Sequence, residues 1–168
     1  MKILILYASK YGCTEDCTSY LKDKIKDNLK DKLKQEVKTI NLKGAGHVDL
    51  QHYDWVIIGG SIYIGKIQKE VKLFCEQNLQ ILLTKNIVLF MCCTTPDQES
   101  EFFSKNFPAS LRKHAEKTVN MGGELRQHKM GFFDKKITAM VSKLEPKKNE
   151  ILYKNIDELA DFLNEKSS

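Results

Sequence analysis

Close to its start the chain reads Ile3-Leu4-Ile5-Leu6-Tyr7-Ala8-Ser9-Lys10-Tyr11-Gly12-Cys13-Thr14. An apolar strand here runs directly into a short loop with hydroxyl groups and a glycine, and the loop opens a helix. Successive backbone N–H groups and the positive helix end then face one anion, while Ser9 and Thr14 add hydroxyl donors and Gly12 permits close approach. The stretch therefore predicts a site for a phosphate monoester.

Two common phosphate motifs do not occur in the sequence. It has no Lys-Ser or Lys-Thr pair at P-loop spacing and no Gly-x-Gly-x-x-Gly fingerprint. This argues against ATP and NAD as ligands. A simpler alternative stays open, in which Ser9 and Thr14 only cap the helix that follows.

Length and composition favour a single domain over residues 1–168. The apolar run over residues 3–6 is far shorter than a transmembrane helix, so we expect a soluble, cytoplasmic protein. The 5 cysteines form no Cys-x-x-Cys pair and have no histidines at zinc spacing, which predicts reduced thiols and no metal site. The net charge of +5 favours an anionic partner or membrane face, unless the lysines only solvate the surface; we expect no nucleic-acid partner.

Strand and helix patterns alternate along the whole chain without a linker or repeat. The expected strands cover residues 2–7, 36–42, 53–60, 86–92 and 118–123, and the expected helices cover 14–33, 67–78, 97–117 and 155–166. This alternation predicts an α/β fold. Right-handed crossovers then favour a five-stranded parallel sheet of order 2-1-3-4-5 between two helical layers.

The pattern Ser/Thr-x-x-Gly-x-Thr after the first strand resembles the phosphate loop of the flavodoxin-like family, which binds flavin mononucleotide (FMN). The loops after the third and fourth strands are similar in place to those that hold the flavin ring. The resemblance implies FMN as cofactor and three binding segments: Ser9, Lys10, Tyr11, Gly12, Cys13 and Thr14; Gly60, Ser61, Ile62, Tyr63 and Gly65; and Cys93, Thr94, Thr95 and Pro96.

Within these loops the resemblance implies that Tyr63 stacks on the flavin ring, although a half-buried tyrosine without a ligand is the alternative. No acid or base in the loops has the spacing of a dedicated proton donor, because Asp97 is expected to cap the next helix. We therefore predict no catalytic side chain, since the flavin itself carries the chemistry. Cys13 is interpreted as a small loop residue rather than a reactive thiol.

A basic segment precedes the last helix. Residues 126–148 contain seven basic and two acidic residues, and residues 131–144 place apolar side chains on one helical face. Such a segment can lie on an anionic membrane, or it can be an extra helix packed on the sheet. Its place and its Gly-aromatic start resemble the quinone-dependent protoporphyrinogen oxidase branch of the family, as does the loop at residues 60–65.

Two segments differ from that branch, Met91-Cys92-Cys93-Thr94-Thr95-Pro96 after the fourth strand and Pro146-Lys147-Lys148-Asn149 after the basic segment. The sequence therefore leaves three functions open. The first is electron transfer through FMN to a redox partner protein, and the second is an FMN enzyme that oxidises a porphyrinogen or similar substrate with a quinone. The third is a non-redox binding module.

Overall fold

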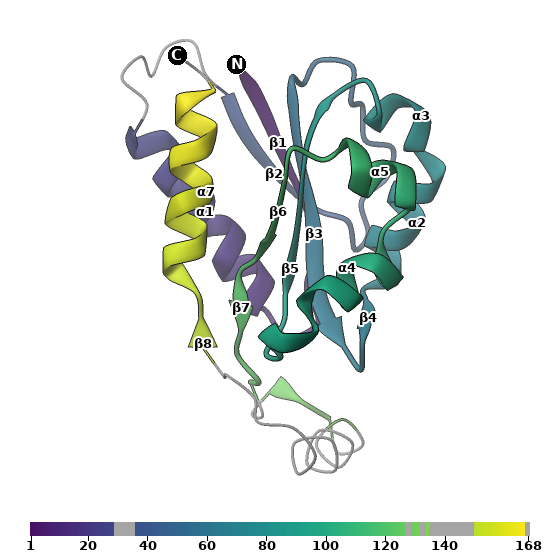
Figure 1. Cartoon of the computed structure of the whole chain (residues 1–168), viewed down its shortest axis with the longest axis vertical. Coiled ribbons are helices and arrows are strands. Elements are labelled where there is room, and N and C mark those ends of the chain that lie inside the picture. The colour runs from purple at the N-terminus through teal and green to yellow at the C-terminus, as the bar shows by residue number, and fades with distance from the viewer. Residues whose placement is uncertain (29–35, 127–128, 132–133, 135–149, 167–168) are drawn as a thin grey trace.

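The computed structural model describes residues 1–28, 36–126, 129–131, 134 and 150–166. Figure 1 shows a central sheet with helices on both of its faces. The strands are β1 (Lys2–Ala8), β2 (Glu36–Asn41), β3 (Trp55–Tyr63), β4 (Lys66–Ile67), β5 (Asn86–Cys92), β6 (Lys117–Asn120), β7 (Gly122–Gly123) and β8 (Glu150–Ile151). The helices are α1 (Cys13–Asn28), α2 (Lys69–Gln77), α3 (Leu79–Leu82), α4 (Glu99–Asn106), α5 (Ala109–His114) and α7 (Tyr153–Glu165), and Pro96–Gln98 form one 3-10 turn.

The parallel strands follow the order β2-β1-β3-β5-β6. Counted along the chain, this is the predicted order 2-1-3-4-5, so the expected α/β sandwich is confirmed. In the register, Ile3 lies beside Val37 on one side and beside Trp55 on the other. The carboxyl ends of β1, β3 and β5 consequently lie at the same edge of the sheet, which is the lower edge in Figure 1.

The alternation of side chains in β1 builds two separate cores. Ile3 and Ile5 belong to a cluster with residues of α1 and α7, whereas Leu4 and Leu6 belong to a cluster with residues of α2 to α5. Figure 1 accordingly shows α1 and α7 on one face of the sheet and the other helices on the opposite face. Both faces of the central strands are covered, which explains their nearly continuous apolar sequences.

Two predicted elements are divided in the structure. The helix expected over residues 97–117 stops at Phe107, whose backbone is extended (φ −121°, ψ 146°), and a second helix starts after Pro108. A proline disfavours the helical conformation of the residue before it, which accounts for the break. Asp97 lies in the 3-10 turn and Gln98 is the residue before α4, so the prediction that Asp97 caps this helix is wrong.

The fifth strand is also shorter than the expected 118–123. The chain leaves the parallel sheet at Met121, and Gly122, with φ +73°, turns it so that β7 pairs antiparallel with β8. A side chain at Gly122 would collide with the Glu150 carbonyl, because a Cβ there would lie 2.3 Å from that oxygen. Glycine is therefore required where the last strand changes partners.

The segment expected as a loop after β3 is instead a hairpin. β3 continues through Tyr63 and pairs with β4, and Ile64 and Gly65 form the turn with φ values of +50° and +69°. Positive φ at both turn residues matches the right-handed twist of a tight hairpin. Because β4 uses Lys66 and Ile67, the next helix begins at Lys69 rather than at Ile67.

The amphipathic helix predicted over residues 131–144 lies largely outside the described residues, as does the end of the first predicted helix at residues 29–33. In the described part of the chain, no helix combines the length and the hydrophobicity that crossing a bilayer requires.

Candidate functional site

The loop between β1 and α1 opens a helix, as the sequence predicted, and whether its backbone N–H groups face an anion stays a prediction. The Gly12 N–H donates to the Ser9 hydroxyl oxygen (2.9 Å), and the Gly12 carbonyl accepts the N–H of Asp16 in the first turn of α1 (3.2 Å). Gly12 has φ +91°, a conformation that costs other residues free energy. The Lys10 N–H donates to the Ser61 hydroxyl (3.2 Å), which joins this loop to β3.

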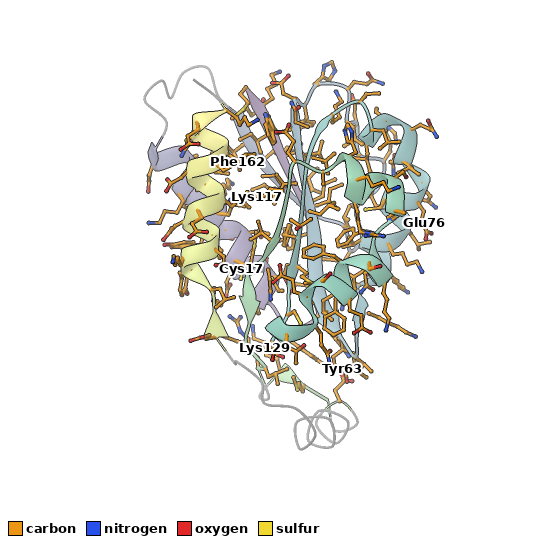
Figure 2. The ribbon with its side chains drawn as sticks, viewed as in Figure 1. Cys17, Tyr63, Glu76, Lys117, Lys129 and Phe162 are labelled. Atoms are coloured by element: carbon orange, nitrogen blue, oxygen red, sulfur yellow. The ribbon has the colours of Figure 1, made fainter. Side chains whose placement is uncertain are left out.

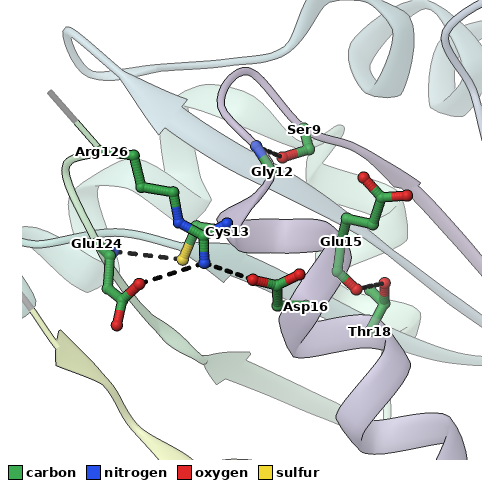
Figure 3. A network of polar contacts seen from close by, with 8 residues as sticks. All are labelled: Ser9, Gly12, Cys13, Glu15, Asp16, Thr18, Glu124 and Arg126. Atoms are coloured by element: carbon green, nitrogen blue, oxygen red, sulfur yellow. Dashed lines mark hydrogen bonds and ion pairs between the residues drawn. The ribbon is translucent and has the colours of Figure 1, made fainter. Parts of the chain in front are cut away.

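Thr14 carries the clearest chemical signal in the loop. Its side chain is completely buried, yet its hydroxyl oxygen has no hydrogen-bond partner among the described residues. A buried hydroxyl without a partner costs about 1–3 kcal/mol. Thr18, one turn later, is also buried, but its hydroxyl donates to the Glu15 carbonyl (2.9 Å; Figure 3). The residues of the loop therefore fit a phosphate that would accept the Thr14 hydroxyl proton in a hydrogen bond.

Two cationic side chains that lie far from Gly12 in the sequence, Arg126 and Lys129, approach it in the structure. A Cβ atom on Gly12 would lie 3.2 Å from both Arg126 Nη1 and Lys129 Nζ. Figure 3 shows the Arg126 side chain between Glu124 and Asp16, beside Cys13. Arg126 forms ion pairs with both carboxylates, at 3.2 Å to Glu124, and the bond to Asp16 is the main reason why its pKa is raised.

The sequence analysis missed Arg126 and Lys129 as site residues. It recorded them only as members of the basic segment, because they lie more than 110 positions after Gly12. Figure 2 places Lys129 at the same end of the molecule as Tyr63. A third cation, Lys43 Nζ, donates to the backbone carbonyl of Ser9 in the same loop.

Asp134 joins the first two predicted binding segments. It accepts hydrogen bonds from Lys10 Nζ (3.1 Å), from the Tyr63 hydroxyl (2.7 Å) and from the Tyr11 hydroxyl. Lys10 Nζ also lies 3.1 Å from the centre of the Tyr63 ring. The hydrogen bonds from Tyr11, Tyr63 and Lys10, in that order, lower the pKa of Asp134 to about 2. The cluster around Asp134 thus ties Tyr63 to the loop of Lys10 and Tyr11.

The segment after β5 is held by local contacts. The N–H of Cys93 donates to Asn120 Oδ1 (3.3 Å), and the Cys93 sulfur accepts the N–H of Thr95 (3.4 Å). Asn120 Oδ1 also accepts the N–H of Gly122 (3.0 Å), so one buried amide connects this segment to the point where β6 ends.

A small cavity lies where the three predicted segments meet. Its volume is about 50 Å³, and its lining includes Ser9, Tyr11 and Cys13, then Ser61, Ile62 and Tyr63, then Thr94. Glu124 and Leu125 cover it from the last part of the chain. Clefts that hold cofactor-sized ligands measure about 300–1,000 Å³. The cavity as it stands is therefore too small for a flavin ring, whose binding would require lining side chains such as Tyr63 to move.

Several predicted residues do not line this cavity. Gly60 is buried inside the sheet, where a Cβ would lie 2.9 Å from the Ala8 carbonyl oxygen, and Gly65 is in the β3–β4 turn. Gly12, Thr14, Cys93 and Thr95 belong to the surrounding segments without lining it, and the side chain of Pro96 lies outside the described part of the structure. Whether each of these residues contacts a cofactor stays a prediction, as does stacking of Tyr63 on a flavin.

Cys13 is not activated by its place at the start of α1. Hydrogen bonding with Cys17, followed by burial, raises the pKa of the Cys13 thiol, and the side chain is 7% exposed. Its sulfur accepts the N–H of Glu124 (3.3 Å; Figure 3). Only the thiolate is a good nucleophile, so Cys13 serves as a packing residue that anchors the last part of the site.

The comparisons with known proteins agree with this architecture. A short-chain flavodoxin associated with a non-canonical PDU bacterial microcompartment superposes with a TM-score of 0.61 at 12% identity, over 100% of this chain and 99% of its own. A flavodoxin from the domain Archaea gives 0.51 at 13% identity, over 99% and 98%. These likenesses, below 25% identity, concern the fold alone.

A part of a larger protein is also similar. The rubredoxin oxygen:oxidoreductase of Desulfovibrio gigas superposes with a TM-score of 0.54 at 14% identity, and this chain covers 36% of that one with 96% of its own length. No curated protein matches this chain. The model of the flavodoxin domain family, however, matches residues 4–151. The chain therefore belongs to the flavodoxin domain family.

Proposed function

We propose that this protein binds FMN and acts as an electron carrier. The observation that supports the proposal most directly is the fully buried Thr14 hydroxyl, which has no hydrogen-bond partner among the described residues and lies in the first turn of α1. The hydroxyl of Ser9, the positive φ of Gly12 and the start of α1 complete a loop suited to a phosphate monoester. Membership of the flavodoxin domain family supports FMN as the phosphate-bearing group.

The chain's own residues bind and orient in this proposal. The loop at residues 9–14 would hold the phosphate, and the segments around Ser61–Tyr63 and Cys93–Thr95 would border the ring. A bound flavin would supply the redox chemistry, because its ring system accepts and donates electrons. The side chains around the cavity would limit access of water and set the polarity near the ring.

A matched pair of threonine variants tests the phosphate assignment. Thr14→Val removes a hydroxyl that forms no hydrogen bond with the described residues, so the FMN-free protein should be as stable as the wild type or about 1 kcal/mol more stable. Its affinity for FMN should fall by about 10- to 100-fold, because a hydrogen bond to a charged phosphate is lost. Flavin fluorescence quenching and urea unfolding measure the two quantities.

Thr18→Val is the control, because that hydroxyl is equally buried but bonds to Glu15 within the helix. It should lower stability by about 1 kcal/mol and leave the FMN affinity unchanged. Equal FMN affinities of Thr14→Val and wild type would contradict the assignment. Failure of the wild type to retain FMN would contradict the proposal as a whole.

Electron transfer also requires a place for the partner to approach. A groove of about 340 Å³ lies next to the cavity and shares Lys10 and Tyr63 with it. Its rim carries the exposed Lys66 and Lys69, and Ile64 in the hairpin turn is 56% exposed. Positively charged lysines around the exposed Ile64 side chain complement a negatively charged protein surface, which supports docking of an acidic redox partner at this groove.

Small oxidants of opposite charge test this docking position. The FMN-loaded, reduced protein should be reoxidised by anionic ferricyanide at a rate that falls with ionic strength and falls several-fold in Lys66→Glu/Lys69→Glu. Cationic hexaammineruthenium(III) should show the opposite trends. The same double substitution at Lys22 and Lys26, on α1, is the control. Identical rates in both double variants would remove the groove from the proposal.

The oxidase alternative stays a prediction. Neither the family match nor the similar structures single out the protoporphyrinogen oxidase branch, and most of the basic segment on which it rested lies outside the described residues. Contact of residues 126–148 with an anionic membrane is likewise untested. An anaerobic reductive titration of the FMN-loaded protein distinguishes the functions, because two resolved one-electron stages favour a carrier and a single two-electron stage favours the oxidase.

A further inference from the structure

Arg126 and Lys129 converge on a single point of the phosphate loop. Arg126 Nη1 and Lys129 Nζ each lie 3.2 Å from the position that a Cβ on Gly12 would occupy. Two like charges this close repel each other, and although Asp16 and Glu124 offset the charge of Arg126, a further anion beside Lys129 would reduce the repulsion. The first turn of α1 adds the positive end of the helix at the same place.

Among the described residues, the nearby carboxylates pair with Arg126 and not with Lys129. Asp16 and Glu124 both pair with Arg126, whose side chain is only 16% exposed. Lys129 is exposed and forms no ion pair with the part of the chain that the structure describes. The Lys129 N–H donates to the Arg126 carbonyl (2.9 Å), and this hydrogen bond helps to keep the two residues close together beside Gly12. The arrangement holds Arg126 in place and keeps a second positive charge available.

We propose that Arg126 and Lys129 complete the phosphate subsite and determine its specificity for a phosphorylated flavin over the uncharged riboflavin. This inference rests on the proposed FMN function and adds two residues from outside the loop to it. Backbone N–H groups and hydroxyls bind an anion by hydrogen bonds alone, whereas these cations neutralise its charge. The preference for FMN should consequently depend on ionic strength.

The test compares FMN with riboflavin, since the two differ in the phosphate. Dissociation constants are measured by fluorescence quenching for the wild type, Lys129→Gln, Arg126→Gln and the double variant. Lys129→Gln should weaken FMN binding by about three- to tenfold and the double variant by about 30-fold or more, with riboflavin affinity unchanged. Raising the salt concentration should weaken FMN binding to the wild type more than to the double variant.

Two further variants serve as controls for this experiment. Arg126→Lys keeps the charge if Arg126→Gln fails to fold, and it should retain most of the preference for FMN. Lys113→Gln removes an exposed charge from α5, which lies on the face of the sheet opposite α1, and it should behave as the wild type. An unchanged FMN-to-riboflavin ratio in the double variant, with FMN still bound by the wild type, overturns the inference. If the wild-type protein does not bind FMN at all, the result contradicts the proposed function instead.

Discussion

At the scale of single residues, Gly12 combines a backbone requirement with a crowded position. Its φ of +91° costs an alanine about 1–2 kcal/mol, and the added Cβ would lie 3.2 Å from two cationic groups. We expect Gly12→Ala to lower the free energy of unfolding by about that amount, measured by urea denaturation. It should also weaken FMN binding, because Arg126 and Lys129 must shift.

The control for this variant is Gly46→Ala. Gly46 has no positive φ, and nothing lies within 4 Å of a Cβ placed there. Its free energy of unfolding should stay within about 0.5 kcal/mol of the wild type. A Gly12→Ala protein as stable as Gly46→Ala would show that the loop adopts another conformation.

Asp134 provides a prediction about pH. Three donors lower its folded-state pKa to about 2 from its usual 3.8. The stabilisation from these contacts is therefore fully present above about pH 4 and is lost as the pH falls toward 2. The difference in melting temperature between wild type and Asp134→Asn should be constant from pH 5 to 8 and shrink below pH 4.

An exposed carboxylate serves as reference for this pH series. Asp23 lies on α1 and has no hydrogen bond to the described residues, so Asp23→Asn should show no such acid-dependent difference. A wild-type advantage over Asp134→Asn that grows as the pH falls would have the wrong sign and would exclude the Asp134 contacts.

At the scale of elements, Asn106 at the end of α4 holds the hairpin that carries Tyr63. Its Oδ1 accepts the N–H of Ile67 (2.8 Å), and its Nδ2 donates to the carbonyls of Gly65 (3.0 Å) and Phe102 (2.8 Å). The side chain is buried, so its removal leaves these backbone groups without partners. The position of the β3–β4 turn therefore depends on one amide from a helix.

Asn106→Ala should lower the free energy of unfolding by about 2–3 kcal/mol, because buried backbone groups lose their hydrogen bonds. Asn106→Asp should be at least as harmful, since an oxygen would then face two carbonyls. Ser104→Ala, on the exposed side of α4, should stay within about 0.5 kcal/mol. Chemical denaturation measures all three, and a neutral Asn106→Ala would refute the role of this amide.

At the scale of the whole molecule, the two cores enclose all 5 cysteines, which are free and buried. Burial raises the pKa of Cys75 to about 12, and hydrogen bonding with Cys17 followed by burial raises that of Cys13. The hydrogen bond with Cys13 lowers the pKa of Cys17, but hydrogen bonding with Cys92 and burial outweigh it and raise that pKa. A thiol reagent at pH 8 should thus react slowly with the native protein, at a rate limited by opening of the fold. All the thiols should react at once in guanidinium chloride.

Ser104→Cys supplies the positive control for this labelling, because position 104 is exposed and should add one fast-reacting thiol. Rapid modification of a thiol in the native wild type would show that one face of the sheet opens locally. Tyr63 and the cavity would then be the first region to examine by hydrogen exchange.

The alternation of strands and helices determined the sheet order, because short right-handed crossovers leave few topologies for five parallel strands. The loop between β1 and α1 was also predictable, since the hydroxyl groups and the glycine that we propose to bind phosphate lie within six consecutive residues, from Ser9 to Thr14. The helical pattern over residues 97–117 did not show that the helix is broken before Pro108. The pattern after β3 likewise predicted a loop, whereas a turn at Gly65 forms the β3–β4 hairpin.

Only the tertiary structure brought Arg126, Lys129 and Asp134 to that loop. The turn at Gly122 takes the chain out of the parallel sheet, and β7 and β8 then hold it beside α1. Contacts between residues more than 110 positions apart have no periodic signature in a sequence, because periodicity reports only which face of a local element is buried. The sequence by itself thus determined the fold and the position of the loop that opens α1, and the packing of distant segments decided which charges surround that loop.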